Sequence, residues 1–176
     1  IARPILARTL AETEGEMQNF IRRIIHASDR LCEGEVLCWT MRPATLATAV
    51  ALDPESAVKV LSQNLHSGNR RESYHAARGL VYLGSASLAV LQNALQSPKP
   101  LVRRRASEAL RDLQAPESLN ALQAALDDSD VTVRINAVRG LTRIGHPQIQ
   151  KVLASRTTDP SQAVRRAIRE GLANTA

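Results

Sequence analysis

Residues 116–145, PESLNALQAALDDSDVTVRINAVRGLTRIG, contain two apolar segments separated by an acidic turn. In the first segment, Leu119, Leu122 and Leu126 have the three- and four-residue spacing that places side chains on one face of a helix. The short polar side chains of residues 127–130 then favour turns and helix caps. This half of the stretch therefore predicts a helix followed by a turn.

The second segment has the same helical periodicity. Val133, Ala137 and Leu141 recur every fourth residue and share one face of a helix. Pro116 suits the first turn of the first helix, where its missing N–H is not needed. Gly145 follows the last apolar residue and suits a left-handed C-cap. Residues 116–145 therefore predict one antiparallel pair of helices.

The same unit recurs along the chain. Intervals of 30, 31 and 31 residues separate the leucines Leu80, Leu110, Leu141 and Leu172. A second set keeps the same intervals: Leu61, Leu91, Leu122 and Leu153. Valine–arginine pairs also recur, at Val102-Arg103, Val133-Arg134 and Val164-Arg165. A two-helix unit of about 30 residues is typical of α-solenoids, so we predict an all-α, right-handed α-solenoid.

The register divides the chain into a repeat region and an atypical beginning. We predict four repeats, over residues 53–84, 85–114, 115–145 and 146–176. Residues 1–52 do not follow the register and are predicted to form an irregular helical cap or a degenerate repeat, with helices over 4–13, 15–31 and 44–52. The chain begins with Ile1. We therefore expect a trimmed chain, a processed chain or a piece of a longer chain or array.

An aspartate and a Val-Arg pair occupy fixed places in the repeats. The pattern is Asp128…Val133-Arg134 and Asp159…Val164-Arg165, with Ser97…Val102-Arg103 as a weaker copy. Over residues 53–174 it resembles the HEAT family, and more closely the short HEAT repeats of phycobilisome-lyase-like proteins. The resemblance implies a ladder between adjacent repeats, formed by Arg103, Asp128, Arg134, Asp159 and Arg165. The first repeat departs from it with Ser67…Glu72-Ser73.

The positive charge belongs to the repeats. The chain has a net charge of +6, but residues 70–176 alone contain 16 basic and 9 acidic side chains. The excess is arginine, with 20 Arg against 3 Lys in the whole chain. Either a GC-rich genome or an anionic partner explains this bias.

Several arginines point away from the apolar face of the second helices on a wheel of about 100° per residue. In an α-solenoid of this kind we expect that side to be concave. The predicted partner-binding set is Arg70, Arg78, Arg104, Arg111, Arg139 and Arg166. It is opposed mainly by Glu108, Asp112 and Glu170, and we expect it to lack exposed aromatic side chains. A basic concave surface attracts anions, and guanidinium groups suit carboxylate and phosphate alike.

Motifs for catalysis or metal binding are absent from the sequence. None of the four histidines is followed by glutamate, whereas iron-dependent hydroxylases built on HEAT-like repeats use His-Glu pairs. No glycine-rich phosphate loop, G-x-S-x-G or H-E-x-x-H occurs. Cys32 and Cys38 are predicted to be buried free thiols, with a local disulfide or a metal contribution as alternatives. We expect no enzymatic activity, no metal and no cofactor.

These features predict an interaction scaffold that binds an acidic protein or peptide on its basic concave surface. The alternative is binding of the nucleic-acid backbone by the same arginines. The family resemblance implies a third role, as a bilin lyase-like chaperone. No run approaches the roughly 18 apolar residues of a membrane span, and no signal peptide is visible. We therefore expect a cytoplasmic protein without a membrane partner.

Overall fold

The computed structural model describes residues 54–174 together with Gly15, Glu16 and Asn19, which are helical. The chain divides into two compact units, residues 1–63 and 64–176. The described residues form helices and turns without a strand. The remaining predictions for residues 1–52, Cys32 and Cys38 included, lie outside the described residues. The predicted all-α class is confirmed for the part of the chain that the structure covers.

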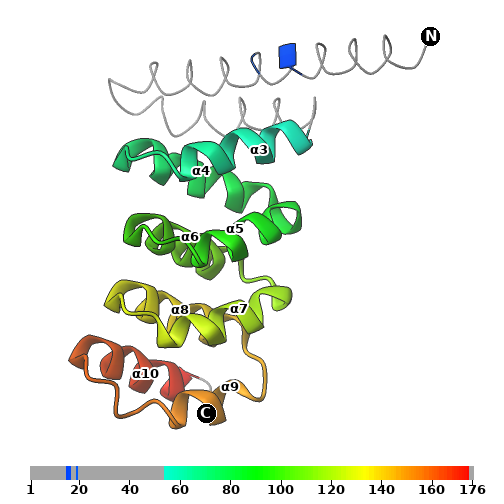
Figure 1. Ribbon diagram of the computed structural model, residues 1–176. Coiled ribbons are helices and arrows are strands. Elements are labelled where there is room, and N and C mark those ends of the chain that lie inside the picture. The colour runs from blue at the N-terminus through cyan, green and yellow to red at the C-terminus, as the bar shows by residue number, and fades with distance from the viewer. Residues whose placement is uncertain (1–14, 17–18, 20–53, 175–176) are drawn as a thin grey trace, which may run out of the picture. The chain divides into compact units, whose positions relative to one another are not determined.

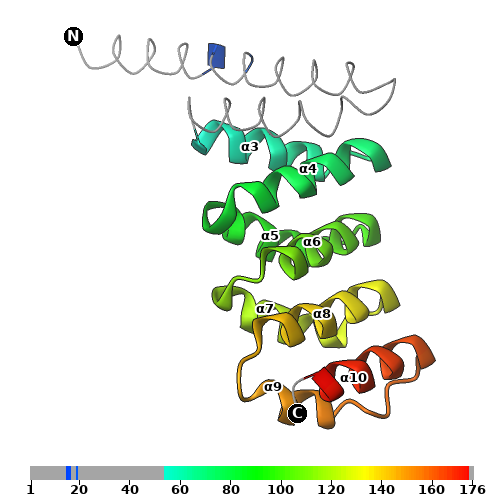
Figure 2. The same ribbon diagram turned by 180° about the vertical axis from the view of Figure 1, so that it is seen from behind.

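The unit of residues 64–176 consists of two layers of helices (Figures 1 and 2). One layer contains the longer second helices of the repeats, α4 (Arg70–Tyr82), α6 (Pro100–Leu113), α8 (Val131–Ile144) and α10 (Gln162–Asn174), and each contacts the next. The other contains the shorter first helices α5 (Leu88–Leu95), α7 (Leu119–Ala124) and α9 (Ile149–Ala154). Each first helix packs on the second helix that follows it. Helix α3 (Pro54–Leu65) falls almost entirely in the other unit.

Helix ends follow the predicted turn chemistry. The Asp130 side chain caps α8 by accepting a 2.9 Å hydrogen bond from the Thr132 N–H. Asn69 caps α4 in the same way. Gly145 ends α8 with φ 69°, the left-handed conformation that glycine adopts without strain. The two ends of α8 are therefore fixed by local residues.

The first helix of this pair is less regular than the sequence predicts. Its expected span, from Pro116 through Leu126, contains only six residues of α-helix. Tighter 3₁₀ turns flank α7, η2 (Pro116–Ser118) before it and η3 (Ala125–Asp127) after it, and a similar turn, η1 (Gly84–Ser87), precedes α5. Such 3₁₀ turns are frequent at the ends of α-helices and as connections between them.

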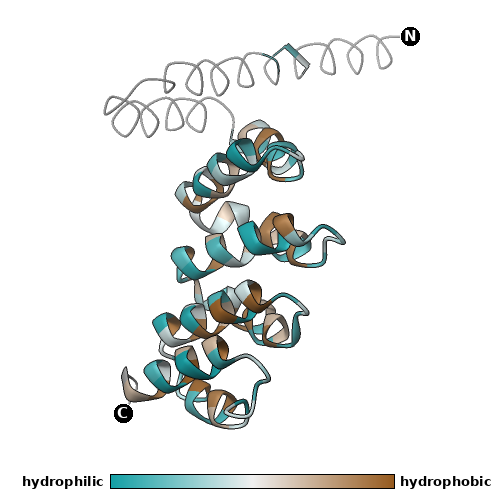
Figure 3. Cartoon of the chain, turned by 90° about the vertical axis from the view of Figure 1, so that its left-hand side faces the viewer, coloured by the Kyte–Doolittle hydropathy of each residue, from teal (hydrophilic) through white to brown (hydrophobic). Residues whose placement is uncertain are grey.

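The repeat leucines form the core between the layers. Leu80, Leu110 and Leu141 are 0% exposed, and burying one leucine contributes about 1.5–3 kcal/mol. Helices cross closely beside them: a Cβ added to Gly140 would lie only 2.9 Å from Leu122 Cδ1. Figure 3 shows both apolar and polar residues along these helices, as amphipathic packing requires. None of the described helices has the length and apolarity that crossing a membrane demands.

Candidate functional site

Basic charge is concentrated in the second helices, α4, α6, α8 and α10, which we call the second-helix layer. These helices contain three, four, three and three arginines, against four acidic residues in all. The first helices α5, α7 and α9 contain a single charged residue, Lys151. Most of the positive charge of the repeat helices therefore lies in the second-helix layer.

Part of this charge is neutralised by aspartates in the loops before α8 and α10. Arg103 donates to Asp128 from Nε at 2.8 Å and from Nη2 at 3.2 Å. One repeat later, Arg134 donates to Asp159 at 2.9 and 3.1 Å. Both pairs are bidentate and nearly buried, with 10–13% of each side chain exposed. Such forks fix both the distance and the orientation of neighbouring repeats.

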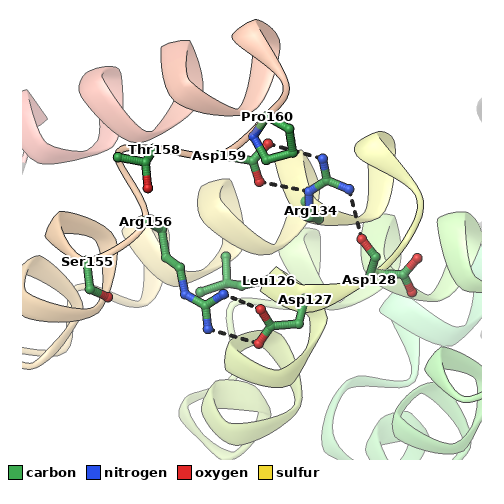
Figure 4. A pocket seen from close by; sticks show the side chains of 9 residues that line it. All are labelled: Leu126, Asp127, Asp128, Arg134, Ser155, Arg156, Thr158, Asp159 and Pro160. Carbon is green, nitrogen blue, oxygen red and sulfur yellow. Dashed lines mark hydrogen bonds and ion pairs between the residues drawn. The ribbon is translucent and has the colours of Figure 1, made fainter.

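The arginines of the Val-Arg pairs also bind backbone carbonyl groups of their own repeat. Nη1 of Arg134 donates to the carbonyl oxygen of Asp128 at 2.8 Å (Figure 4) and to that of Ser129 at 3.3 Å. Nη1 of Arg165 donates likewise to Asp159 and Pro160, at 2.6 and 3.1 Å. Arg165 has no carboxylate partner among the described residues. The five residues predicted to form a ladder thus provide two bidentate pairs and one arginine that binds backbone alone.

The pKa of Asp159 follows from this environment. Burial of its carboxyl alone raises the pKa, but the hydrogen bonds from Arg134 and the Ser161 N–H outweigh that effect. The charges of Arg134 and Arg165 act in the same direction. The pKa of Asp159 therefore lies below its ordinary value, and the carboxylate stays ionised at neutral pH.

Four members of the predicted partner-binding set have carboxylate partners, and two of them, Arg104 and Arg166, each have a carboxylate of their own. Arg104 pairs with Asp130 at 2.7 Å, and this hydrogen bond and charge raise the pKa of Arg104. Arg166 pairs with Glu170 one turn along α10, at 2.8 Å. In contrast, Arg70 and Arg139 are exposed and have no ion pair with any residue that the structure describes. Arg70 and Arg139 therefore keep their full charge toward solvent.

Three arginines from three neighbouring second helices, α4, α6 and α8, converge on one carboxylate. Arg78 of α4 donates to Asp112 Oδ2 at 3.3 Å. Arg111 of α6 and Arg143 of α8 donate to Asp112 Oδ1 at 2.9 and 3.1 Å. We call these four residues the Asp112 cluster. One carboxylate cannot neutralise three guanidinium groups, so the cluster keeps an excess of positive charge.

The structure adds one arginine, Arg143, that the helical wheel did not select. Arg143 belongs to the Asp112 cluster, and the sequence signal for it was its place 31 residues after Asp112. Arg111 is half-buried rather than fully exposed, because Asn136 accepts a 3.0 Å hydrogen bond from its Nη1. The expected lack of exposed aromatic side chains is wrong, since Tyr82 is 53% exposed.

A pocket of about 490 Å³ lies on the loop side of the last two repeats (Figure 4). Among its charged lining residues, Arg134 pairs with Asp159 and Arg156 with Asp127, while the Asp128 carboxylate pairs with Arg103 outside the lining. The hydrogen bond with Arg156 lowers the pKa of Asp127, and that of Arg156 is raised. These pairs nearly neutralise the pocket, so it is a weaker anion site than the second-helix layer. Elsewhere in the described part, histidines, cysteines and carboxylates form no group of three suited to a metal ion.

Comparison with protein families gives one clear match. The family model described as HEAT repeats matches residues 58–133 and 122–176. Among curated proteins, the chain is similar to the phycocyanin operon protein Z of Pseudanabaena tenuis, with 33% identity over 79 residues. The match covers 45% of this chain and 39% of that protein. The chain therefore matches about two fifths of the length of this relative.

Solved structures share the fold. Human deoxyhypusine hydroxylase, solved in complex with glycerol, matches with a TM-score of 0.58 and 25% identity, over 67% of this chain and 43% of that one. An engineered protein matches with a TM-score of 0.52 and 22% identity, over 76% of this chain and 66% of that one. The second likeness shows the fold alone.

Proposed function

Since the chain belongs to the HEAT-repeat family, we propose that it is a non-enzymatic scaffold that binds an acidic protein or peptide on its second-helix layer. The observation that carries the proposal is the charge of this layer. Its arginines exceed the carboxylates that contact them, while the first helices contribute only Lys151. An acidic chain lying across the layer would meet guanidinium groups on every helix.

Physical reasons favour an acidic ligand. Arginine keeps its charge at any physiological pH and presents a planar fork that matches a carboxylate. Arg70 and Arg139 are exposed to solvent and have no ion pair with any described residue, so a ligand can bind them without breaking one. A surface of one sign also steers the opposite charge toward itself and accelerates association.

The likeness to deoxyhypusine hydroxylase raises the question of catalysis. The sequence lacks the His-Glu pairs used by HEAT-like iron hydroxylases, because each histidine precedes alanine, serine or proline. The pairing of acidic residues with arginine also leaves few carboxylates for acid–base chemistry. We therefore place the function in binding.

The proposal is tested with a fluorescein-labelled polyglutamate peptide and two variants of equal charge change. Arg139→Glu reverses an exposed, unpaired arginine of α8, and Lys151→Glu reverses an exposed lysine of α9. We expect Arg139→Glu to weaken binding about tenfold and Lys151→Glu to change it less than threefold, or about 0.65 kcal/mol. Equal effects, or no binding of the wild-type protein at low salt, would overturn the proposal.

A second candidate follows from the relative in a phycocyanin operon. A bilin has propionate groups, which the same arginines could hold. Mixing the protein with a free bilin and recording the visible spectrum tests this function directly. A shifted absorption band that Arg139→Glu abolishes would support bilin binding over peptide binding.

A further inference from the structure

The Asp112 cluster differs from the other ion pairs of the second-helix layer in its charge balance. Arg103, Arg104 and Arg134 each have a loop aspartate of their own. In the Asp112 cluster, three guanidinium groups share one carboxylate. Two positive charges therefore remain at one place, around Asp112 of α6, which α4 and α8 both contact.

The cluster is also held in position before any ligand binds. Nη1 of Arg111 donates to Asn136 Oδ1 at 3.0 Å, and Nδ2 of Asn136 donates to Ser107 Oγ at 3.1 Å. Asn136 and Ser107 are buried, so this chain of hydrogen bonds fixes Arg111 and with it Asp112. Preorganised charges bind a ligand without first being ordered by it.

Donors remain available on the two outer arginines. The side chains of Arg78 and Arg143 are 53% and 49% exposed. Each guanidinium has five N–H donors, and the structure assigns one of them on Arg78 and one on Arg143 to Asp112. An incoming carboxylate can therefore bind either arginine while Asp112 stays in place.

An exposed aromatic ring adjoins this charge. Tyr82 lies one turn after Arg78 on α4, so the two side chains share one side of that helix. It also occupies the place on α4 that Asp112 has on α6 and Arg143 has on α8. Asp112 follows Tyr82 by 30 residues, and Arg143 follows Asp112 by 31. Tyrosine and arginine are among the residue types that are enriched in the hot spots of protein interfaces.

We propose that Tyr82 and the Asp112 cluster form the anchor for an acidic peptide segment that carries an apolar side chain between its acidic ones. The acidic side chains bind Arg78 and Arg143, and the apolar side chain packs on Tyr82. This inference rests on the proposed function and names the part of the layer that dominates it. It differs from general charge attraction, which would treat all exposed arginines of the layer alike.

The test uses two labelled glutamate-rich peptides that differ only at two central positions, leucine in one and alanine in the other. The cluster variant Arg78→Gln with Arg143→Gln is compared with a control of equal charge change, Arg139→Gln with Arg166→Gln. We expect the cluster variant to lose about tenfold or more in affinity for both peptides, and the control about threefold. Tyr82→Ala should lose about fivefold for the leucine peptide alone. Thermal melts check that every variant is folded.

Each outcome bears on one statement. If both peptides bind but the two double variants lose affinity equally, the anchor is wrong and the proposed function stands. If Tyr82→Ala affects both peptides equally, the apolar contact is wrong. If neither peptide binds the wild-type protein at low salt, the proposed function fails and the anchor with it. A single-stranded DNA of about 20 nucleotides that binds more tightly than either peptide would overturn the anchor in favour of nucleic acid.

Discussion

At the scale of single residues, equivalent positions in the repeats have different surroundings. Leu110 packs between the layers and is 0% exposed. Leu172 occupies the equivalent place in the last repeat and is only partly buried. Because the contribution of an apolar side chain depends on the area it removes from water, the two leucines should contribute unequally to stability.

We expect Leu110→Ala to lower the free energy of unfolding by about 2–5 kcal/mol, because it leaves a cavity in a closely packed layer. The matched variant Leu172→Ala should cost less than half as much. Urea unfolding followed by circular dichroism measures both. Equal losses would contradict the packing described for these leucines.

At the scale of secondary-structure elements, arginine forks connect neighbouring repeats. Arg134 binds two carbonyl oxygens before α8 and the Asp159 carboxylate before α10. With the residues that the structure describes, Arg165 makes only the backbone contacts. The two residues therefore separate the contribution of the ion pair between repeats from that of the turn within one repeat.

We expect Arg134→Met to destabilise the protein by about 2–4 kcal/mol, since it leaves Asp159 charged and without its main partner. Arg165→Met should cost about 1 kcal/mol or less. Thermal or urea unfolding of the two variants provides the comparison. A larger loss for Arg165→Met would contradict the assigned roles.

The lowered pKa of Asp159 gives this element a defined pH dependence. A carboxyl with a lower pKa in the folded state stabilises that state above its unfolded pKa, and this contribution disappears as pH falls through the folded pKa. Wild-type protein and Asp159→Asn should therefore differ most above about pH 5 and converge as pH falls below about 4. Unfolding midpoints measured across this range test the expectation, and a difference that is independent of pH would refute it.

At the scale of the whole molecule, the sequence predicts the repeats better than the binding surface. The leucine and Val-Arg spacings predict helix pairs because burial leaves little choice of residue at those places. An arginine on a helical wheel, in contrast, has no assigned partner. Arg104 pairs with Asp130 in the loop before α8, and Arg143 of α8 pairs with Asp112 of α6. These pairings depend on how repeats stack, so the charge that remains available follows only from the structure.

The same argument applies to Tyr82. Its place in the repeat is taken by Asp112 and Arg143 in the next two repeats, and this polar row was a signal that the ring is exposed. An isolated tyrosine in an apolar helix gives no such signal. Comparison of equivalent positions across repeats therefore improves the prediction of exposure in this chain.

The most direct test of the central claim is an NMR titration of the arginine Nε–Hε signals with a glutamate-rich peptide. If the second-helix layer binds the peptide, the signals of Arg78, Arg139 and Arg143 should shift together. The signal of Arg156, which pairs with Asp127 on the loop side, should remain in place. Shifts at Arg156 with none at Arg139 would contradict binding on the second-helix layer.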